Sequence, residues 1–197
     1  MDALLRRLAF LVEIADRRKG TDCSPRLGKT AMQKLLYLLQ EGLGVEVGYH
    51  FSLYTYGPYD TGVMGDLDYA GAIGLLQLEY DTDEGYQIQP GGNADDLREE
   101  RETISLEASG DFKRLFDLFG SLSARQLELR ATLHYVAVEE PQASKGDLLE
   151  RVHALKPKYD KQELEDALDK LVEAKFLSPP ADSAQPQPKR RRKSSQE

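Results

Sequence analysis

The stretch that most constrains the fold is LGKTAMQKLLYLLQ, residues 27–40, because its apolar residues recur with the period of a helix. Such an unbroken stripe predicts a helix that is buried along one face. The stripe consists of Met32, Leu35, Leu36, Leu39 and Leu43. Thr30 is followed three residues later by Gln33, a spacing that predicts a capping box at the start of this helix.

The same stretch contains Gly28-Lys29-Thr30, which are also the last three residues of a phosphate-binding P-loop. A P-loop needs a further glycine five residues before this Gly-Lys pair, and Cys23 stands there. The missing glycine matters because the loop must wrap its backbone N–H groups closely around phosphate. The pattern therefore favours a capped core helix over a nucleotide site.

Further periodic segments flank this helix in the first half of the chain. Apolar residues at helical spacing predict a helix over residues 2–19. Alternation in YHFSLYTYGPYD predicts a half-buried strand that Gly57-Pro58 turns. Asp60 is placed to cap a helix that runs to about Ile73. Residues 75–90 read as a β-hairpin with its tip at residues 81–84. This order predicts a winged-helix-like unit over residues 1–90, with the hairpin as the wing.

The second half predicts a helical unit. Residues 91–110 form a polar connector, of which residues 91–102 are irregular or loosely helical. Residues 111–178 contain helical patterns that end in a helix-turn-helix-like pair. In that pair Pro157 ends the helix over residues 145–155, and Asp160 caps the helix over residues 161–177. On the first helix Val152 and Leu155 are expected to face four residues of the second: Leu164, Leu168, Leu171 and Val172. Residues 179–197 lack apolar periodicity, which predicts a disordered basic tail. The fold class is mostly α, of the α+β type.

Composition and charge limit the class of protein and its partners. Apolar residues make up 40% and charged residues 30% of the chain, as in a soluble globular protein, and no apolar run is long enough for a membrane span. The N-terminus does not have the pattern of a signal peptide, and a single Cys23 indicates a reduced cytoplasm. The net charge is −8, although residues 1–34 and 189–197 each carry a net charge of +4. The body between the two basic ends is therefore strongly acidic.

Four segments give the chain a family resemblance: KTAMQKLLYLLQ, YHFSLYTYGPYDTGVMGDLD, LELRATLHYVA and ALKPKYDKQELEDALDKL. Together they resemble the YwgA-like family of uncharacterised prokaryotic proteins, over about residues 5–178. The first half is also similar to the Panacea or SocA-like domain, in which a K-L-x-K-L-L-Y helix precedes a strand ending in Gly-Pro. Lys34-Leu35-Leu36-Tyr37 and Tyr56-Gly57-Pro58 match that pattern. The resemblance implies a protein that binds another protein, as an antitoxin or a proteolytic adaptor.

Winged-helix units suggest DNA binding, but the charges of this chain argue against the usual mode. The helix after Gly57-Pro58 carries Asp60, Asp66 and Asp68 without any Lys or Arg, and the wing tip is also acidic. Acidic elements are repelled by phosphates, so a DNA-binding transcriptional regulator, the alternative function, would use the basic ends. Those candidate nucleic-acid contacts are Arg17, Arg18, Lys19, Arg26, Lys29, Lys189, Arg190, Arg191, Arg192 and Lys193.

Tyrosines offer a better candidate for a binding surface. Seven of the ten lie within residues 49–86, and tyrosine is enriched in interface hot spots. If Phe51 and Leu53 face the core, Tyr54 and Tyr56 lie on the other side of the strand, either exposed or covering the next helix. The hypothesis is a protein-binding surface formed by Tyr54, Tyr56, Tyr59, Asp60 and Asp66.

Catalytic patterns are weak in this sequence. His50, His134 and His153 have no second ligand at metal-binding spacing, and His134 among apolar neighbours is typical of a buried, hydrogen-bonded histidine. The sequence therefore predicts a non-enzymatic regulatory protein without catalytic residues, metal or cofactor. The expected partner is another protein, with nucleic acid possible through the basic tail and no membrane.

Overall fold

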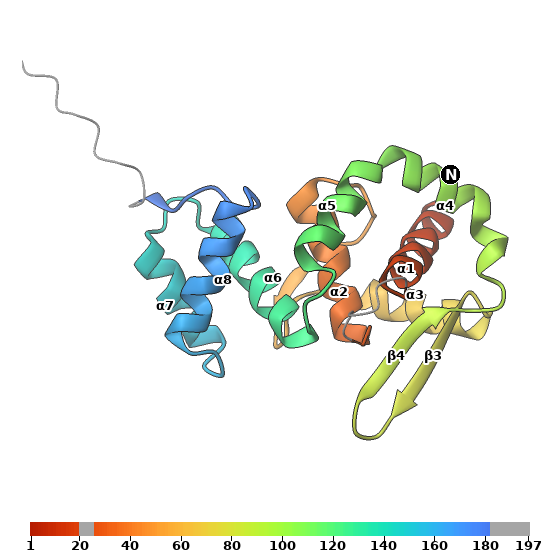
Figure 1. Cartoon of the computed structure of the whole chain (residues 1–197), viewed down its shortest axis with the longest axis horizontal. Coiled ribbons are helices and arrows are strands. Elements are labelled where there is room, and N and C mark those ends of the chain that lie inside the picture. Colours follow the sequence, from red (N-terminus) through yellow and green to blue (C-terminus); the bar gives the residue numbers. More distant parts are fainter. Residues whose placement is uncertain (20–25, 182–197) are drawn as a thin grey trace, which may run out of the picture.

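The computed structural model describes residues 1–19 and 26–181, which are mostly helical with two small antiparallel sheets (Figure 1). This confirms the predicted α+β class. The α-helices are α1 (Ala3–Lys19), α2 (Lys29–Tyr37), α3 (Thr61–Ala72), α4 (Arg98–Glu107), α5 (Ser109–Phe119), α6 (Ala124–Glu139), α7 (Lys145–Leu155) and α8 (Lys161–Glu173). A π-turn, η1 (Leu38–Gly42), extends α2, and a 3-10 turn, η2 (Ala94–Leu97), precedes α4. The strands are β1 (Ser52–Tyr54), β2 (Gly57–Tyr59), β3 (Leu76–Asp81) and β4 (Gly85–Pro90).

Helix α1 lies at the centre of the N-terminal half (Figure 1). Residues 8–12 are buried without interruption, because α2, α3, α4 and β4 surround the helix. A helix that is apolar all round in its middle is typical of such a central position. The other elements of this half are therefore arranged around α1.

The start of α2 differs from the prediction. Gly28 is the N-cap residue and no side chain caps the helix, so the predicted capping box of Thr30 and Gln33 is wrong. Gln33 is buried instead, where its Nε2 donates to the carbonyl of Asp60 at 2.8 Å and its Oε1 accepts from the Asp60 N–H at 3.2 Å. A long-range partner thus replaces the local one, and it ties α2 to the segment that begins α3.

The segment around Gly-Pro forms a hairpin and not a single strand. Leu53 pairs with Pro58 and Tyr54 pairs with Gly57, so the turn consists of the two residues between Tyr54 and Gly57. The expectation that Gly57-Pro58 turns the chain is therefore wrong, because both residues belong to β2. Asp60 caps α3 as predicted, and its side chain accepts from the Gly62 N–H at 2.5 Å.

The hairpin of β3 and β4 has the predicted position and projects from the body (Figure 1). Its register pairs Leu76 with Pro90 and Asp81 with Gly85. At its base Ile88 is buried, and the Ile88 N–H donates to the carbonyl of Leu27 at 2.8 Å. This bond fixes the hairpin to the segment that leads into α2.

The polar segment after this hairpin is helical and packs on the body. Ile104 of α4 is fully buried against the core, and Arg101 of the same helix lies 3.0 Å from a Glu13 oxygen and 2.6 Å from an Asp16 oxygen of α1. Of the two alternatives for residues 91–102, irregular or loosely helical, the structure contains the helical one.

The C-terminal helices meet the N-terminal half through α6. This helix contacts α2 and β2 as well as α7 and α8. Val152 of α7 and Leu164, Leu168 and Leu171 of α8 are buried as predicted, Val172 is partly buried, and Leu155 is 45% exposed. The α8 cap is confirmed, since Asp160 forms a capping box with Glu163. The buried apolar residues from α1 to α8 form one cluster, so the predicted units share a core. None of the helices in the described ranges combines the length and the apolar character needed to cross a membrane.

Candidate functional site

The hairpin of β1 and β2 displays two tyrosines to solvent. Tyr54 is 66% exposed and Tyr56 is 59% exposed, although tyrosines bury much of their ring in most folds. Tyr59 is half-buried, and its ring centroid lies 5.7 Å from that of Tyr54. Of the two alternatives for these rings, exposed or covering the next helix, Tyr54 and Tyr56 adopt the exposed one.

The tip of this hairpin is held by a lysine from the other half of the chain. Lys156 follows α7, and its Nζ donates to the carbonyl of Thr55, 101 residues earlier. The residue is 4% exposed, so its ammonium group is enclosed by protein. The Nζ of Lys156 donates its hydrogen bond to Thr55, and it also forms an ion pair with an oxygen of Glu128 at 2.9 Å. The turn therefore has a charged anchor beneath it.

A second buried lysine holds strand β2. Lys34 of α2 is 1% exposed, and its Nζ donates to the carbonyl of Pro58 at 2.6 Å. Burial lowers the pKa of Lys34 to about 8, an effect that the carboxylate of Glu128 opposes and the ammonium of Lys156 reinforces. A buried amine keeps an N–H donor in either protonation state, so the bond to β2 persists.

Gly57 brings the hairpin backbone against α6. Its φ of +81° belongs to the left-handed region, and a Cβ placed there would lie 2.6 Å from Oγ1 of Thr132. Only a glycine satisfies both conditions at this position. We call Lys34, Gly57, Glu128, Thr132 and Lys156 the hairpin dock.

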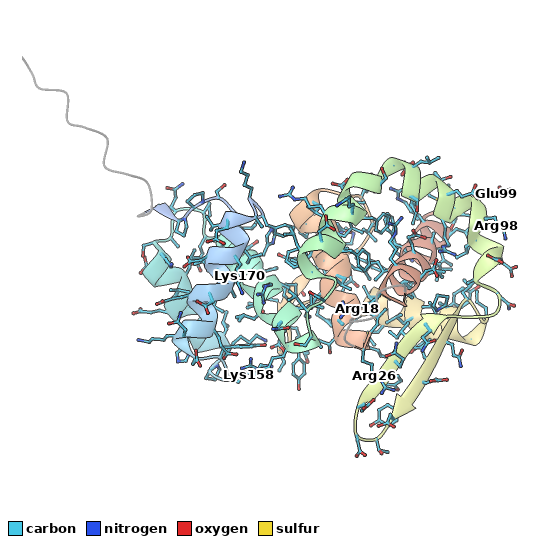
Figure 2. The ribbon with its side chains drawn as sticks, in the orientation of Figure 1. Arg18, Arg26, Arg98, Glu99, Lys158 and Lys170 are labelled. Atoms are coloured by element: carbon cyan, nitrogen blue, oxygen red, sulfur yellow. The ribbon has the colours of Figure 1, made fainter. Side chains whose placement is uncertain are left out.

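Glu128 is the counter-ion of the hairpin dock. It is 3% exposed on α6, and its second oxygen lies 2.8 Å from Nζ of Lys158. One carboxylate thus pairs with the ammonium groups of Lys156 and Lys158, and it also acts electrostatically on the buried ammonium of Lys34. Lys158 lies in the α7–α8 turn, and its Nζ is also 5.6 Å from the ring centroid of Tyr56 (Figure 2). The exposed ring of Tyr56 therefore lies within cation–π distance of a lysine that is itself paired with Glu128.

Four segments that lie far apart in the sequence, residues 29–40, 49–68, 127–137 and 154–171, meet at this dock. Lys34 comes from the first segment, Gly57 from the second, Glu128 from the third and Lys156 from the fourth. Sequence reasoning did not select Lys34, Glu128 or Lys156 as functional residues. No signal marked Lys34 as buried, because it lies outside the apolar stripe of its helix.

His134 lies beside the dock and is buried as predicted. It is 3% exposed, its Nδ1 is 2.8 Å from the hydroxyl of Tyr37, and burial lowers the pKa of His134 to about 4. The ring is therefore neutral at pH 7. Its role in this arrangement is to join α6 to α2, because Tyr37 is itself buried.

The two aspartates of the predicted surface have other roles. Asp60 accepts hydrogen bonds from the N–H groups of Gly62 and His50, so it organises the backbone on both sides of the hairpin. Asp66 is 8% exposed, and its carboxylate accepts from Nε of Arg7 at 2.7 Å and from the Tyr49 hydroxyl at 2.9 Å. Asp66 therefore does not belong to the exposed surface, since an internal ion pair occupies it.

The basic residues near the first loop do not form an open patch. Arg18 is 3% exposed and donates to the carbonyl of Leu122 at 2.8 Å. The others that the structure describes pair with acidic groups: Arg17 with Glu13, Arg26 with Glu84, and Lys29 with Asp68. Lys19 closes α1. The basic run Lys189–Lys193 and Cys23 lie outside the described residues.

A groove of about 480 Å³ opens between η1, residues 44–51 and the end of α6. Its lining includes the apolar or aromatic side chains of Tyr37, Val45, Tyr49, Phe51, Tyr135 and Val138, and the acidic side chains of Glu41, Glu46 and Glu139. The side chain of Gln40 shapes it by binding the backbone of Gly48 and Tyr49. Its acidic groups favour a cationic side chain over an anion.

Within the part of the chain that the structure describes, no group of three or more His, Cys, Asp or Glu side chains is arranged to hold a metal ion. A scan against protein-family models finds no model that matches this sequence, and a search of curated proteins finds no matching relative.

Proposed function

We propose that this protein is a non-enzymatic binding protein, which recognises another protein through the Tyr54–Tyr56 hairpin. The observation that carries the proposal is a pair of exposed tyrosines on a hairpin whose turn and second strand are held by buried lysines. Aromatic side chains of this kind dominate binding energies at protein interfaces.

Rigidity supports the same proposal. A surface that is already fixed before binding loses less conformational entropy when the partner arrives. Lys156, Lys34 and Gly57 fix the backbone on either side of Tyr56, and the cation of Lys158 lies against its ring. We infer that the role is regulatory, as the resemblance to antitoxins and adaptors implies.

The test is capture of partners from a lysate of the native host, treated with nuclease, with matched pairs of variants. Tyr54→Ala with Tyr56→Ala should abolish capture of a stoichiometric protein, because both hot-spot rings are removed. Tyr80→Ala with Tyr86→Ala is the control, since these exposed rings form a comparable pair with centroids 5.0 Å apart on the other hairpin. Thermal unfolding of both variants checks that each remains folded.

Equal capture of the partner by both double variants would show that the β1–β2 hairpin is not the binding surface. Recovery of nucleic acid alone, lost after nuclease treatment and weakened by salt, would favour the DNA-binding alternative. The second outcome contradicts the proposed function itself, and the first contradicts only its location.

A further inference from the structure

A second groove, of about 440 Å³, lies between α5, the α5–α6 connection and α8. Its size is within the range of small-molecule sites. Most of its wall is apolar, from Leu118, Phe119, Leu122, Leu171 and Ala174. It shares no lining residue with the hairpin dock, so its occupant need not be the partner of that surface.

Arg130 is the unusual member of this lining. It projects from α6, is 9% exposed, and donates from Nη1 to the carbonyl of Gln126 at 3.2 Å. A guanidinium has five N–H donors, so this bond uses one of them. Among the described residues no carboxylate forms an ion pair with Arg130, and burial alone lowers the pKa of its guanidinium.

The acidic residues of the groove do not neutralise this cation. Asp117 pairs with Lys113 at 2.5 Å on the outer face of α5, and its side chain is 60% exposed. Glu173 is exposed at the end of α8, where Lys170 is also exposed. The buried charge of the groove is therefore positive, and its walls are apolar.

Burial of an unpaired charge is costly unless a partner of opposite charge compensates it. A carboxylate matches the planar fork of a guanidinium and can bind two N–H groups at once. An apolar body attached to that carboxylate would cover the leucine and phenylalanine side chains. Phosphate would satisfy the charge but would leave this apolar wall in water.

We propose that this groove binds a small organic carboxylate with an apolar body, its carboxylate paired with Arg130 and its body against Leu122, Phe119 and Leu171. Lys170 stands at the rim and adds a second cation. Figure 2 shows Lys170 on α8, at the opposite end of the molecule from Arg98 on α4. The proposal is independent of the protein-binding function, because it uses other residues.

Calorimetric titration of the full chain with octanoate tests the site. Octanoate should bind saturably at one site, whereas phosphate and octan-1-ol, which each offer half of the chemistry, should bind at least about tenfold more weakly. Absence of saturable octanoate binding would overturn the proposal, as would equal binding of octan-1-ol.

Variants separate this site from nonspecific uptake. Arg130→Gln should weaken octanoate binding by about tenfold or more. Without octanoate its urea midpoint should match or exceed that of the wild type, because a buried unpaired charge is removed. Arg98→Gln is the control, since Arg98 is exposed and pairs with Asp95, and it should leave binding unchanged.

Lys170→Glu keeps the test decisive if Arg130→Gln does not fold, because the exposed position of Lys170 tolerates substitution. A negative charge at the rim should weaken octanoate binding several-fold. Unchanged octanoate binding in the Lys170 variant, or in a folded Arg130 variant, would contradict the assignment.

Discussion

At the scale of single residues, the hairpin dock depends on ammonium groups that are removed from water. An isolated buried ammonium is costly, and here each has a carbonyl acceptor. Glu128 forms an ion pair with Lys156 and also acts electrostatically on the ammonium of Lys34. The hydrogen bonds that Lys34 and Lys156 would form with water are therefore replaced by hydrogen bonds to protein carbonyls. The same charges make the dock sensitive to pH, because one carboxylate does not balance all of its cations.

Lys34 should make the free energy of unfolding rise with pH. Its pKa is lowered to about 8 in the folded protein from an ordinary value of 10.5, so the unfolded chain binds more protons between these values. From pH 7 to 9.5 the wild type should gain about 2 kcal/mol relative to Lys34→Met, whose side chain does not titrate. Urea unfolding of both proteins at each pH measures this difference.

Comparison with Lys34→Met cancels the contribution of the other titratable groups, which both proteins share. A constant difference across this pH range would show that Lys34 has an ordinary pKa in the folded protein.

At the scale of elements, helices were predictable and contacts between distant segments were not. The apolar period located α1, α2 and α8, because a helix of this kind buries one face wherever it packs. The cap of α2 was not predictable, since Gln33 bonds to Asp60 and not to its own first turn. The exposed tyrosines could be selected by type, whereas Glu128 and Lys156 required the packing of α6 and α7 to be known.

Gly57→Ala should be more destabilising than Gly85→Ala. Both glycines have positive φ values, +81° and +77°, so both variants carry a comparable backbone strain of about 1–2 kcal/mol. At Gly85 a Cβ meets open space, while at Gly57 it would meet Thr132. Displacement of the hairpin should add about 1–3 kcal/mol to the cost at Gly57.

Urea unfolding of the two glycine variants gives the comparison, and Thr132→Ala combined with Gly57→Ala should recover part of the difference. Equal losses of stability for the two glycine variants would mean that the hairpin backbone at Gly57 is not in close contact with α6.

At the scale of the whole molecule, α6 makes one body of what the sequence divides into two units. The polar connector predicted between them packs on α1, and the core is a single cluster from α1 to α8. The division was inferred from polar composition. However, an amphipathic helix with one buried face, such as α4, has the same composition as a linker.

The shared core predicts that the protein unfolds in one transition. Urea curves followed by far-UV circular dichroism and by tyrosine fluorescence should coincide, because the aromatic rings near α2 and the helices α7 and α8 depend on the same packing. The chain contains no Trp, so tyrosine emission is not masked. Separate midpoints for the two signals would mean that the halves unfold independently.

The hydrogen bond from Lys156 to Thr55 has a consequence for the synthesis of the protein on the ribosome. During translation Thr55 at the hairpin tip is synthesised 101 residues before its anchoring lysine. Throughout that interval the tyrosine pair exists without its final support. A partner that requires the hairpin turn in its anchored conformation therefore binds completed chains and does not bind nascent chains.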